Sequence, residues 1–217
     1  MSEALLLNVG VIIGVILVSM TLHEAMHGYV AYWLGDDTAK MHGRLTLNPI
    51  RHIDPFLTIL LPVMLALVGG PIFGGAKPVP FNPERVRYDE WGAALVALAG
   101  PLTNLFLAFF IFGIGALLGC NPGDFTSTNI VSMILAYGVV VNLGFFVFNM
   151  IPLPPLDGSR VLYALAPDPV RRAMEYIEQY GLIFVFIIVL FASSLIGVFM
   201  NEIIQFFVDL FSKIFIV

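Results

Sequence analysis

The sequence predicts an all-α polytopic membrane protein, a helical bundle of about four to five transmembrane helices with a short re-entrant or β-strand insertion after the first span. Two features of the composition predict it. Hydrophobic residues make up 59% of the 217-residue chain and charged residues only 12%, against about 25% charged residues in soluble domains. The mean hydropathy is +0.94. In addition, several uncharged apolar stretches are long enough to cross a bilayer as helices.

The first predicted span covers residues 4–34 and ends at Gly35, a common helix stop. It lacks the basic start and the cleavage site of a signal peptide, so we expect it to be retained. Residues 23–27 read HEAMH, an HExxH motif. On a helix, His23 and His27 project from one face and are placed to bind one Zn²⁺. Glu24 lies beside them as general base for a metal-bound water.

The position of this motif makes it specific. It follows an apolar run from Leu5 to Leu22. Ionisable side chains at or near hydrocarbon depth are costly and are seldom present without a function. We therefore prefer a metal site to the alternative of two histidines that merely end a membrane helix.

The second apolar stretch, residues 56–68, is short and contains Pro62. Its length and the glycines that follow favour a re-entrant element over a full span. Residues 43–49 alternate and end in a turn signal, which predicts a strand. Residues 77–80 read KPVP, which indicates an edge strand or an extended segment because proline cannot sit in a central strand.

Three longer stretches complete the predicted bundle, at residues 91–118, 130–151 and 181–200. The tail, residues 201–217, carries polar residues on one helical side and is predicted to be a C-terminal amphipathic helix, either interfacial or packed on a neighbour. A simple extension of the last span stays open as an alternative. No repeat and no accessory domain is visible, so residues 1–217 form a single predicted membrane-embedded domain.

Basic residues predict the orientation of the bundle. They cluster after the first span, after the second stretch and after the fourth span, whereas residues 119–129 contain none. If residues 56–68 re-enter, all three clusters share one side, and the positive-inside rule places them in the cytoplasm with the N-terminus outside.

A catalytic zinc usually takes three protein ligands and keeps one position for water. The candidates for the third ligand are His42, His52, Asp54, Glu84 and Asp157. Three prolines, Pro152, Pro154 and Pro155, break the fourth span just before Asp157. That helix end is predicted to lie on the same side as His23 and His27. From the residues alone, Asp157 is either this ligand or the N-cap of the next helix.

Composition excludes other classes. A net charge of −5 and the lack of a basic stripe argue against nucleic acid as a partner. The single cysteine, Cys120, excludes an internal disulfide and a Cys-rich zinc ribbon.

Taken in order, three patterns resemble the site-2 protease family of intramembrane zinc metalloproteases. They are HExxH at residues 23–27, Gly100-Pro101-Leu102-Thr103-Asn104 in the third span, and Asn149 to Gly158 with its Leu-Asp-Gly ending. The resemblance covers roughly residues 21–162 and is closest to the compact prokaryotic branch, which lacks PDZ and CBS domains.

The resemblance implies zinc bound by His23, His27 and Asp157, with Glu24 as catalytic acid and base. We expect Asn149 or Asn104 to assist at the oxyanion, while Asn104 is also suited to a hydrogen bond between packed helices. The implied substrate is a single-pass membrane protein, either intact or already trimmed, which must unwind locally. Residues 77–80 or 43–47 are candidate edges for the extended peptide. The expected location is the prokaryotic cell membrane, with the site near the cytoplasmic face.

Two other classes compete with this interpretation. A transporter or channel would bind an ion at broken helices but predicts repeat symmetry, which this sequence lacks. A catalytically inactive binding protein would retain the fold, but the intact Glu24 speaks against it. The sequence does not indicate an oligomeric state.

Overall fold

The computed structural model describes residues 3–60, 75–120 and 129–215. Within these ranges every regular element is helical and no strand is formed. The all-helical bundle is therefore confirmed, whereas the predicted β-strand insertion is not confirmed in the part described. Most of the predicted re-entrant stretch, residues 61–68, lies outside the described residues.

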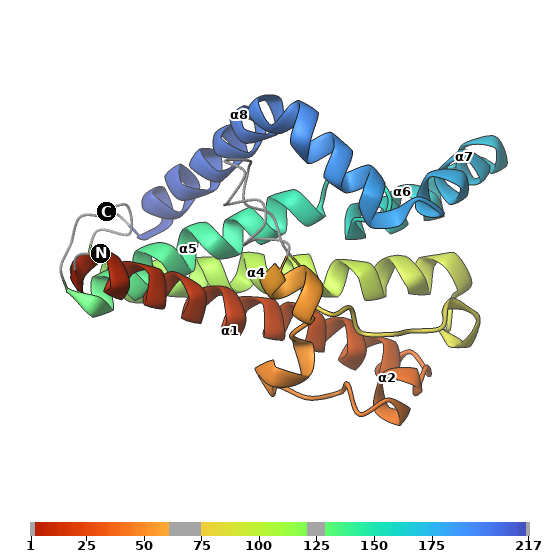
Figure 1. Ribbon diagram of the computed structural model, residues 1–217, viewed down its shortest axis with the longest axis horizontal. Coiled ribbons are helices and arrows are strands. Elements are labelled where there is room, and N and C mark those ends of the chain that lie inside the picture. Colours follow the sequence, from red (N-terminus) through yellow and green to blue (C-terminus); the bar gives the residue numbers. More distant parts are fainter. Residues whose placement is uncertain (1–2, 61–74, 121–128, 216–217) are drawn as a thin grey trace.

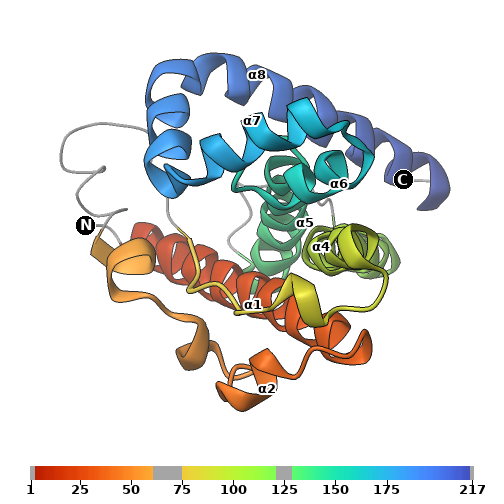
Figure 2. The same cartoon turned by 90° about the vertical axis from the view of Figure 1, so that its right-hand side faces the viewer.

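Among the described residues, four helices are long and apolar enough to cross a membrane. They are α1 (Glu3–Trp33), α4 (Asp89–Leu117), α5 (Ile130–Asn149) and α8 (Gly181–Phe215). The first three lie side by side, and α8 leans across the bundle (Figure 1, Figure 2). The predicted first, third and fourth spans match α1, α4 and α5 within a few residues.

Small residues allow these helices to approach closely. A Cβ atom added at Gly138 on α5 would lie 3.1 Å from the side chain of Ile111 on α4, and one added at Gly113 would lie 2.6 Å from Phe215. Between them, Phe112, Leu143 and Phe211 form a buried apolar cluster. Close packing of this kind holds helices together where lipid removes the hydrophobic drive for association.

The C-terminal tail continues the last helix, which is one of the alternatives that the sequence left open. The helix does not divide near residue 200 but runs from Gly181 to Phe215, with non-helical backbone angles at Ala192. The physical reason is a row of phenylalanines, Phe207, Phe211 and Phe215, which packs the second limb against α4 and α5. The tail is thus part of a kinked bundle helix, and residues 190–215 form its candidate span.

The insertion between α1 and α4 leaves and rejoins the bundle at the same end. The amide of Arg87 donates to the carbonyl of Leu34 (2.9 Å), and that of Asn82 donates to Oδ2 of Asp36 (2.6 Å). Short helical turns make up much of the described part: α2 (Thr38–Met41), η1 (Pro49–His52), η2 (Pro55–Leu60) and η3 (Pro83–Arg85).

Residues 43–47 do not form the strand that their alternation predicts. The amide of Arg44 donates to Ala39 and that of Thr46 donates to Arg44, so the backbone turns. The Arg44 guanidinium points inward and donates to the carbonyl of Lys77 (2.5 Å). The need to pair this buried charge outweighs the local alternation.

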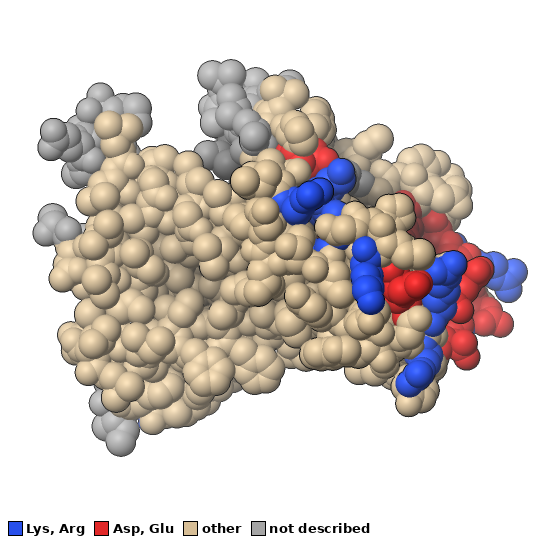
Figure 3. Space-filling model, turned by 90° about the horizontal axis from the view of Figure 1, so that it is seen from below, with Lys and Arg blue, Asp and Glu red and all other residues tan. Residues whose placement is uncertain are grey.

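Charged side chains gather toward one end on the face shown in Figure 3, and the tan surface of the other end carries none. The charged end holds the junction of α1 and α4 and the hairpin of α6 (Asp157–Leu165) and α7 (Asp168–Glu178) (Figure 1). This division is what a bundle embedded by its uncharged part would show.

Candidate metal centre

The HExxH motif lies on the buried face of α1. His23 and His27 are 6% and 9% exposed, and their Nε2 atoms are 3.1 Å apart. The helical period brings the two rings together as the sequence predicts. Both Nε2 atoms therefore face one small volume between α1, α4 and the start of α6.

The outer nitrogen of each ring is held by an acceptor on α4. Nδ1–H of His23 donates to Oδ1 of Asn104 (2.6 Å), and Nδ1–H of His27 donates to the carbonyl of Val96 (2.7 Å). A carbonyl oxygen can only accept, so each neutral ring carries its proton on Nδ1 and a lone pair on Nε2. This is the tautomer that a metal ligand needs.

Asp157 reaches the same place from the start of α6. Helix α5 ends at Asn149, and α6 begins at Asp157. The N-cap of α6 is Leu156, and no side chain caps the helix. Oδ2 of Asp157 lies 3.1 Å from Nε2 of His23 and 3.4 Å from Nε2 of His27. The N-cap alternative for Asp157 is therefore not what the structure shows.

These three atoms fit a cation. Two imidazole lone pairs and a carboxylate oxygen face one another, and Oδ2 is buried with no hydrogen bond satisfying it. Such an arrangement is repulsive unless a cation or protons lie between the atoms. Tetrahedral ligands at about 2.0–2.1 Å from zinc lie about 3.3 Å apart, close to the observed separations of 3.1–3.4 Å.

Gly100 on α4 makes the room for this cluster. A Cβ atom at this position would lie 2.4 Å from Nε2 of His27 and 2.6 Å from Nε2 of His23. Any larger residue would therefore fill the space that the two imidazoles face. The lack of space beside the two imidazoles thus explains why the Gly100-to-Asn104 pattern begins with glycine.

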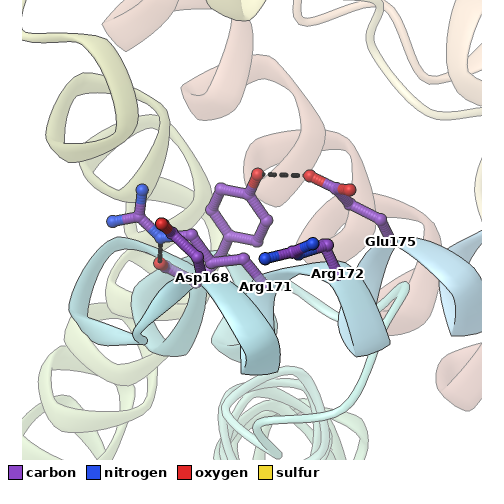
Figure 4. A pocket seen from close by; sticks show the side chains of 5 residues that line it. Asp168, Arg171, Arg172 and Glu175 are labelled. Carbon is purple, nitrogen blue, oxygen red and sulfur yellow. Dashed lines mark hydrogen bonds between the residues drawn. The ribbon is translucent and has the colours of Figure 1, made fainter.

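The hairpin that carries Asp157 is tied to the bundle through Arg171 on α7. Its guanidinium donates to the carbonyls of Tyr163 (3.0 Å) and Ala164 (3.2 Å), which caps the last turn of α6. It also lies 3.5 Å from the carboxylate of Glu90 at the start of α4. The hydroxyl of Tyr163 donates to Glu175 (2.6 Å) (Figure 4). These bonds fix the helix on which Asp157 is the first residue.

Glu24 lies next to the cluster. A ligand atom of its carboxylate lies within 4.8 Å of those of His23 and His27. Oε2 accepts a hydrogen bond from the backbone N–H of Val79 (2.9 Å). The structure thus brings His23, Glu24, His27 and Asp157 together, as the sequence predicts.

The two asparagines lie in different surroundings. Asn104 is fully buried behind His23, and its amide donates to Oδ1 of Asn142 (2.8 Å) and, at 3.4 Å, to the carbonyl of Ser19. Its donors are used between packed helices, the alternative left open by the sequence. Asn149 is half-buried at the end of α5 and donates to the carbonyl of Phe145 (3.0 Å). An oxyanion role for either one stays a prediction.

The rival ligands are not brought into the cluster. His42 is exposed. His52 is fully buried, but its Nε2 is 2.8 Å from the carbonyl of Thr46. The backbone N–H of Asp54 donates to the hydroxyl of Thr58, and its carboxylate accepts from the N–H of Phe56. Among the described residues, the one cluster of metal-binding groups is the one at the HExxH motif.

The sequence did not lead us to predict the hydrogen bonds that hold Asn104 in place behind His23. The amide of Asn142 donates to the hydroxyl of Ser19 (2.9 Å) and to the carbonyl of Gly138 (2.7 Å). A continuous chain therefore runs from His23 through Asn104 and Asn142 to Ser19. The signal was present, since Ser19 and Asn142 are polar residues inside apolar runs. The contribution of Val96 comes from its backbone and leaves no such signal.

Comparison with known proteins shows which family this chain resembles. The model of peptidase family M50 matches residues 120–193. A Bacillus subtilis protein named "Putative zinc metalloprotease YwhC" is 44% identical over 83% of this chain and 79% of its own length. A Mycolicibacterium smegmatis protein named "Putative zinc metalloprotease Rip2" is 32% identical over 93% of this chain and 75% of its own length. No solved structure gives a significant match.

Proposed function

The chain belongs to peptidase family M50, the site-2 protease family of zinc metalloproteases, and from that premise we propose that it hydrolyses peptide bonds of single-pass membrane proteins within or near the bilayer. The protein is a multi-pass membrane protein, and the part that the structure describes contains four helices suited to spanning a membrane. The proposal adds the substrate class, the place of cleavage and the residues that act.

The observation that carries the proposal is the position of Asp157. Its Oδ2 atom is buried, lacks a hydrogen-bond partner and lies 3.1 and 3.4 Å from the two histidine Nε2 atoms. His23, His27 and Asp157 would hold the zinc, which leaves a fourth position for water. When bound, zinc supplies Lewis acidity at that position and lowers the pKa of water to about 7.

The protein's own residues supply the remaining steps. Glu24 accepts the proton of the attacking water and passes it to the leaving amine. Asn104 and the carbonyl of Val96 keep both imidazoles oriented through Nδ1. The buried, apolar wall of the bundle strengthens these interactions because it lowers the local dielectric constant.

The position of the site supports cleavage near one face of the membrane. His23 and His27 lie in the C-terminal part of α1, toward the end of the bundle at which charged residues gather (Figure 3). We assign this end to the cytoplasm by the positive-inside rule. Water then reaches the site from that side, and the substrate helix must extend locally to expose its scissile carbonyl.

Residues 77–80 are not a free edge for that extended peptide. The N–H of Lys77 donates to His52 (2.9 Å), the N–H of Val79 donates to Glu24, and Pro78 and Pro80 carry no N–H. Pairing with a substrate through the backbone donors of this run would break existing bonds. We therefore propose that the peptide is held elsewhere.

The test uses purified protein in liposomes together with a single-span peptide. The peptide carries a fluorophore at one end of its helix and a quencher at the other, so that cleavage between them restores fluorescence. The wild type should cleave the peptide, whereas Glu24→Gln should retain zinc and show no cleavage, a loss of at least about 100-fold. Equal turnover by the two proteins would overturn the role of Glu24. Loss of zinc in Glu24→Gln would instead make Glu24 a ligand.

A further inference from the structure

The general base is held by a residue 55 positions away in the sequence. Oε2 of Glu24 accepts a hydrogen bond of 2.9 Å from the backbone N–H of Val79. This bond joins the HExxH helix to the extended segment of residues 77–82, which lies in the insertion between α1 and α4. It engages the side chain next to the metal cluster rather than a metal ligand.

The local sequence makes this donor specific. Within Lys77-Pro78-Val79-Pro80, the two prolines have no N–H, and the N–H of Lys77 is used by His52. Val79 therefore supplies the single remaining backbone donor of the run. Prolines on both sides also restrict the backbone, which reduces the freedom lost when the N–H is aimed at Glu24.

Further contacts hold Val79 itself and the two residues before it. Arg44 donates to the carbonyls of Lys77 (2.5 Å) and, at 3.4 Å, Pro78. The side chain of Val79 is buried against the helix, where a Cβ atom added at Gly28 would lie 3.1 Å from its Cγ1 atom. The glycine that follows the motif thus makes the space that lets the segment approach Glu24.

We propose that the backbone N–H of Val79 positions the carboxylate of Glu24 for proton transfer. Binding Oε2 fixes the rotation of the carboxylate and leaves Oε1 as the oxygen that accepts the proton. General bases act only from a defined orientation within hydrogen-bond reach. This inference rests on the proposed role of Glu24, and it makes Val79 a positioning residue.

The experiment removes one N–H and keeps the side chain, by replacing Val79 with its α-hydroxy acid so that the amide becomes an ester. The matched control is the same replacement at Val131, at the start of α5. Its N–H donates to Oδ1 of Asn129 (2.8 Å). Both proteins lose a hydrogen bond to a side-chain oxygen. We measure kcat and KM for the fluorescent single-span peptide, together with zinc content.

The Val79 ester should lower kcat about 10-fold or more, a part of the 10²–10⁴-fold that a general base contributes, with KM and zinc content unchanged. The Val131 ester should match the wild type. In Glu24→Asp, whose shorter side chain cannot reach both partners, the Val79 ester should cost much less. An unchanged kcat, a loss of zinc, or a rise in KM alone would overturn the proposal.

A second measurement needs no turnover. Hydrogen exchange across residues 78–81 reports the amides of Val79 and Phe81 only, because prolines occupy the other two positions. Glu24→Ala should increase exchange in this segment and leave the Val131 amide unchanged. Equal protection with and without the Glu24 side chain would overturn the bond. Failure of Glu24→Gln to stop cleavage would instead count against the proposed function.

Discussion

Two regions meet at the HExxH helix and hold its residues in different ways. On the bundle side, membrane helices fix the histidines through buried bonds to Asn104 and Val96. On the other side, Glu24 is reached by the 77–82 segment, which has no regular structure. The metal ligands thus depend on close helix packing, whereas the general base depends on a segment pinned by a few polar contacts.

This difference separates two kinds of damage. Changes on the bundle side should remove the metal, because each imidazole is oriented by a rigid helix. Changes in the 77–82 segment should leave the metal bound and alter the chemistry. Measuring zinc content beside turnover therefore distinguishes the two regions in every variant.

The largest effect is expected from Asp157→Ala. It removes the proposed third ligand and leaves two imidazole lone pairs facing each other. We expect zinc affinity to fall by more than the roughly 10–100-fold that loss of an outer-shell partner costs. Metal analysis by mass spectrometry checks it. His42→Ala and His52→Ala are the controls, and zinc loss in either one with retention in Asp157→Ala would refute the assignment.

Gly100→Ala tests the bundle side without removing any polar group. Its Cβ would lie 2.4 and 2.6 Å from the two Nε2 atoms, so the rings or α4 must shift. Zinc content should fall at least about 10-fold, in the range of outer-shell losses. Gly144→Ala on α5 is the control, since a Cβ atom there meets nothing within 4 Å. Normal zinc binding in Gly100→Ala would mean that the helices can separate freely.

Much of the metal cluster and of the helices that carry it could be predicted from the sequence. The period of a helix brings His23 and His27 together, and three prolines before Asp157 end α5 where the acid is needed. The bounds of α1, α4 and α5 followed from apolar length. Backbone contributions could not be predicted, because the carbonyl of Val96 and the amide of Val79 act independently of their side chains.

Long-range packing explains the other differences. The second limb of α8 packs on α4 and α5 through Phe207, Phe211 and Phe215, contacts that the local pattern does not contain. The alternation of residues 43–47 predicts a strand, but Arg44 pairs with Lys77 and Pro78 far along the chain. In both cases tertiary contacts outweigh local propensity.

Asn142→Leu tests how far the support of His23 extends. The substitution removes the acceptor that holds the amide of Asn104 and leaves a buried donor with one partner fewer. We expect zinc affinity to fall about 10-fold, at the low end for an outer-shell change. Isothermal titration with a competing chelator measures it. Affinity equal to the wild type would show that Asn104 alone orients the ring.

The smallest effect is expected where the 77–82 segment is pinned to the end of α1. Asp36 is buried there and accepts hydrogen bonds from Thr38 and from the amide of Asn82. Burial raises its pKa, but the bonds from Thr38 and Asn82 and the nearby Arg85 outweigh this effect and hold the pKa below its ordinary value. The ionised carboxylate therefore stabilises the folded segment.

Asp36→Asn should loosen this junction without affecting zinc. We expect about fivefold faster hydrogen exchange at Arg87, whose amide bonds Leu34, the equivalent of one net hydrogen bond. Because the folded pKa is lowered, the stability from Asp36 is fully present above the pKa of an unfolded aspartate, about 4, and is lost as pH falls through the folded value. Protection factors in the wild type should therefore decline below about pH 4, and Asp36→Asn should lack that decline. An identical decline in both proteins would assign the effect to another carboxylate.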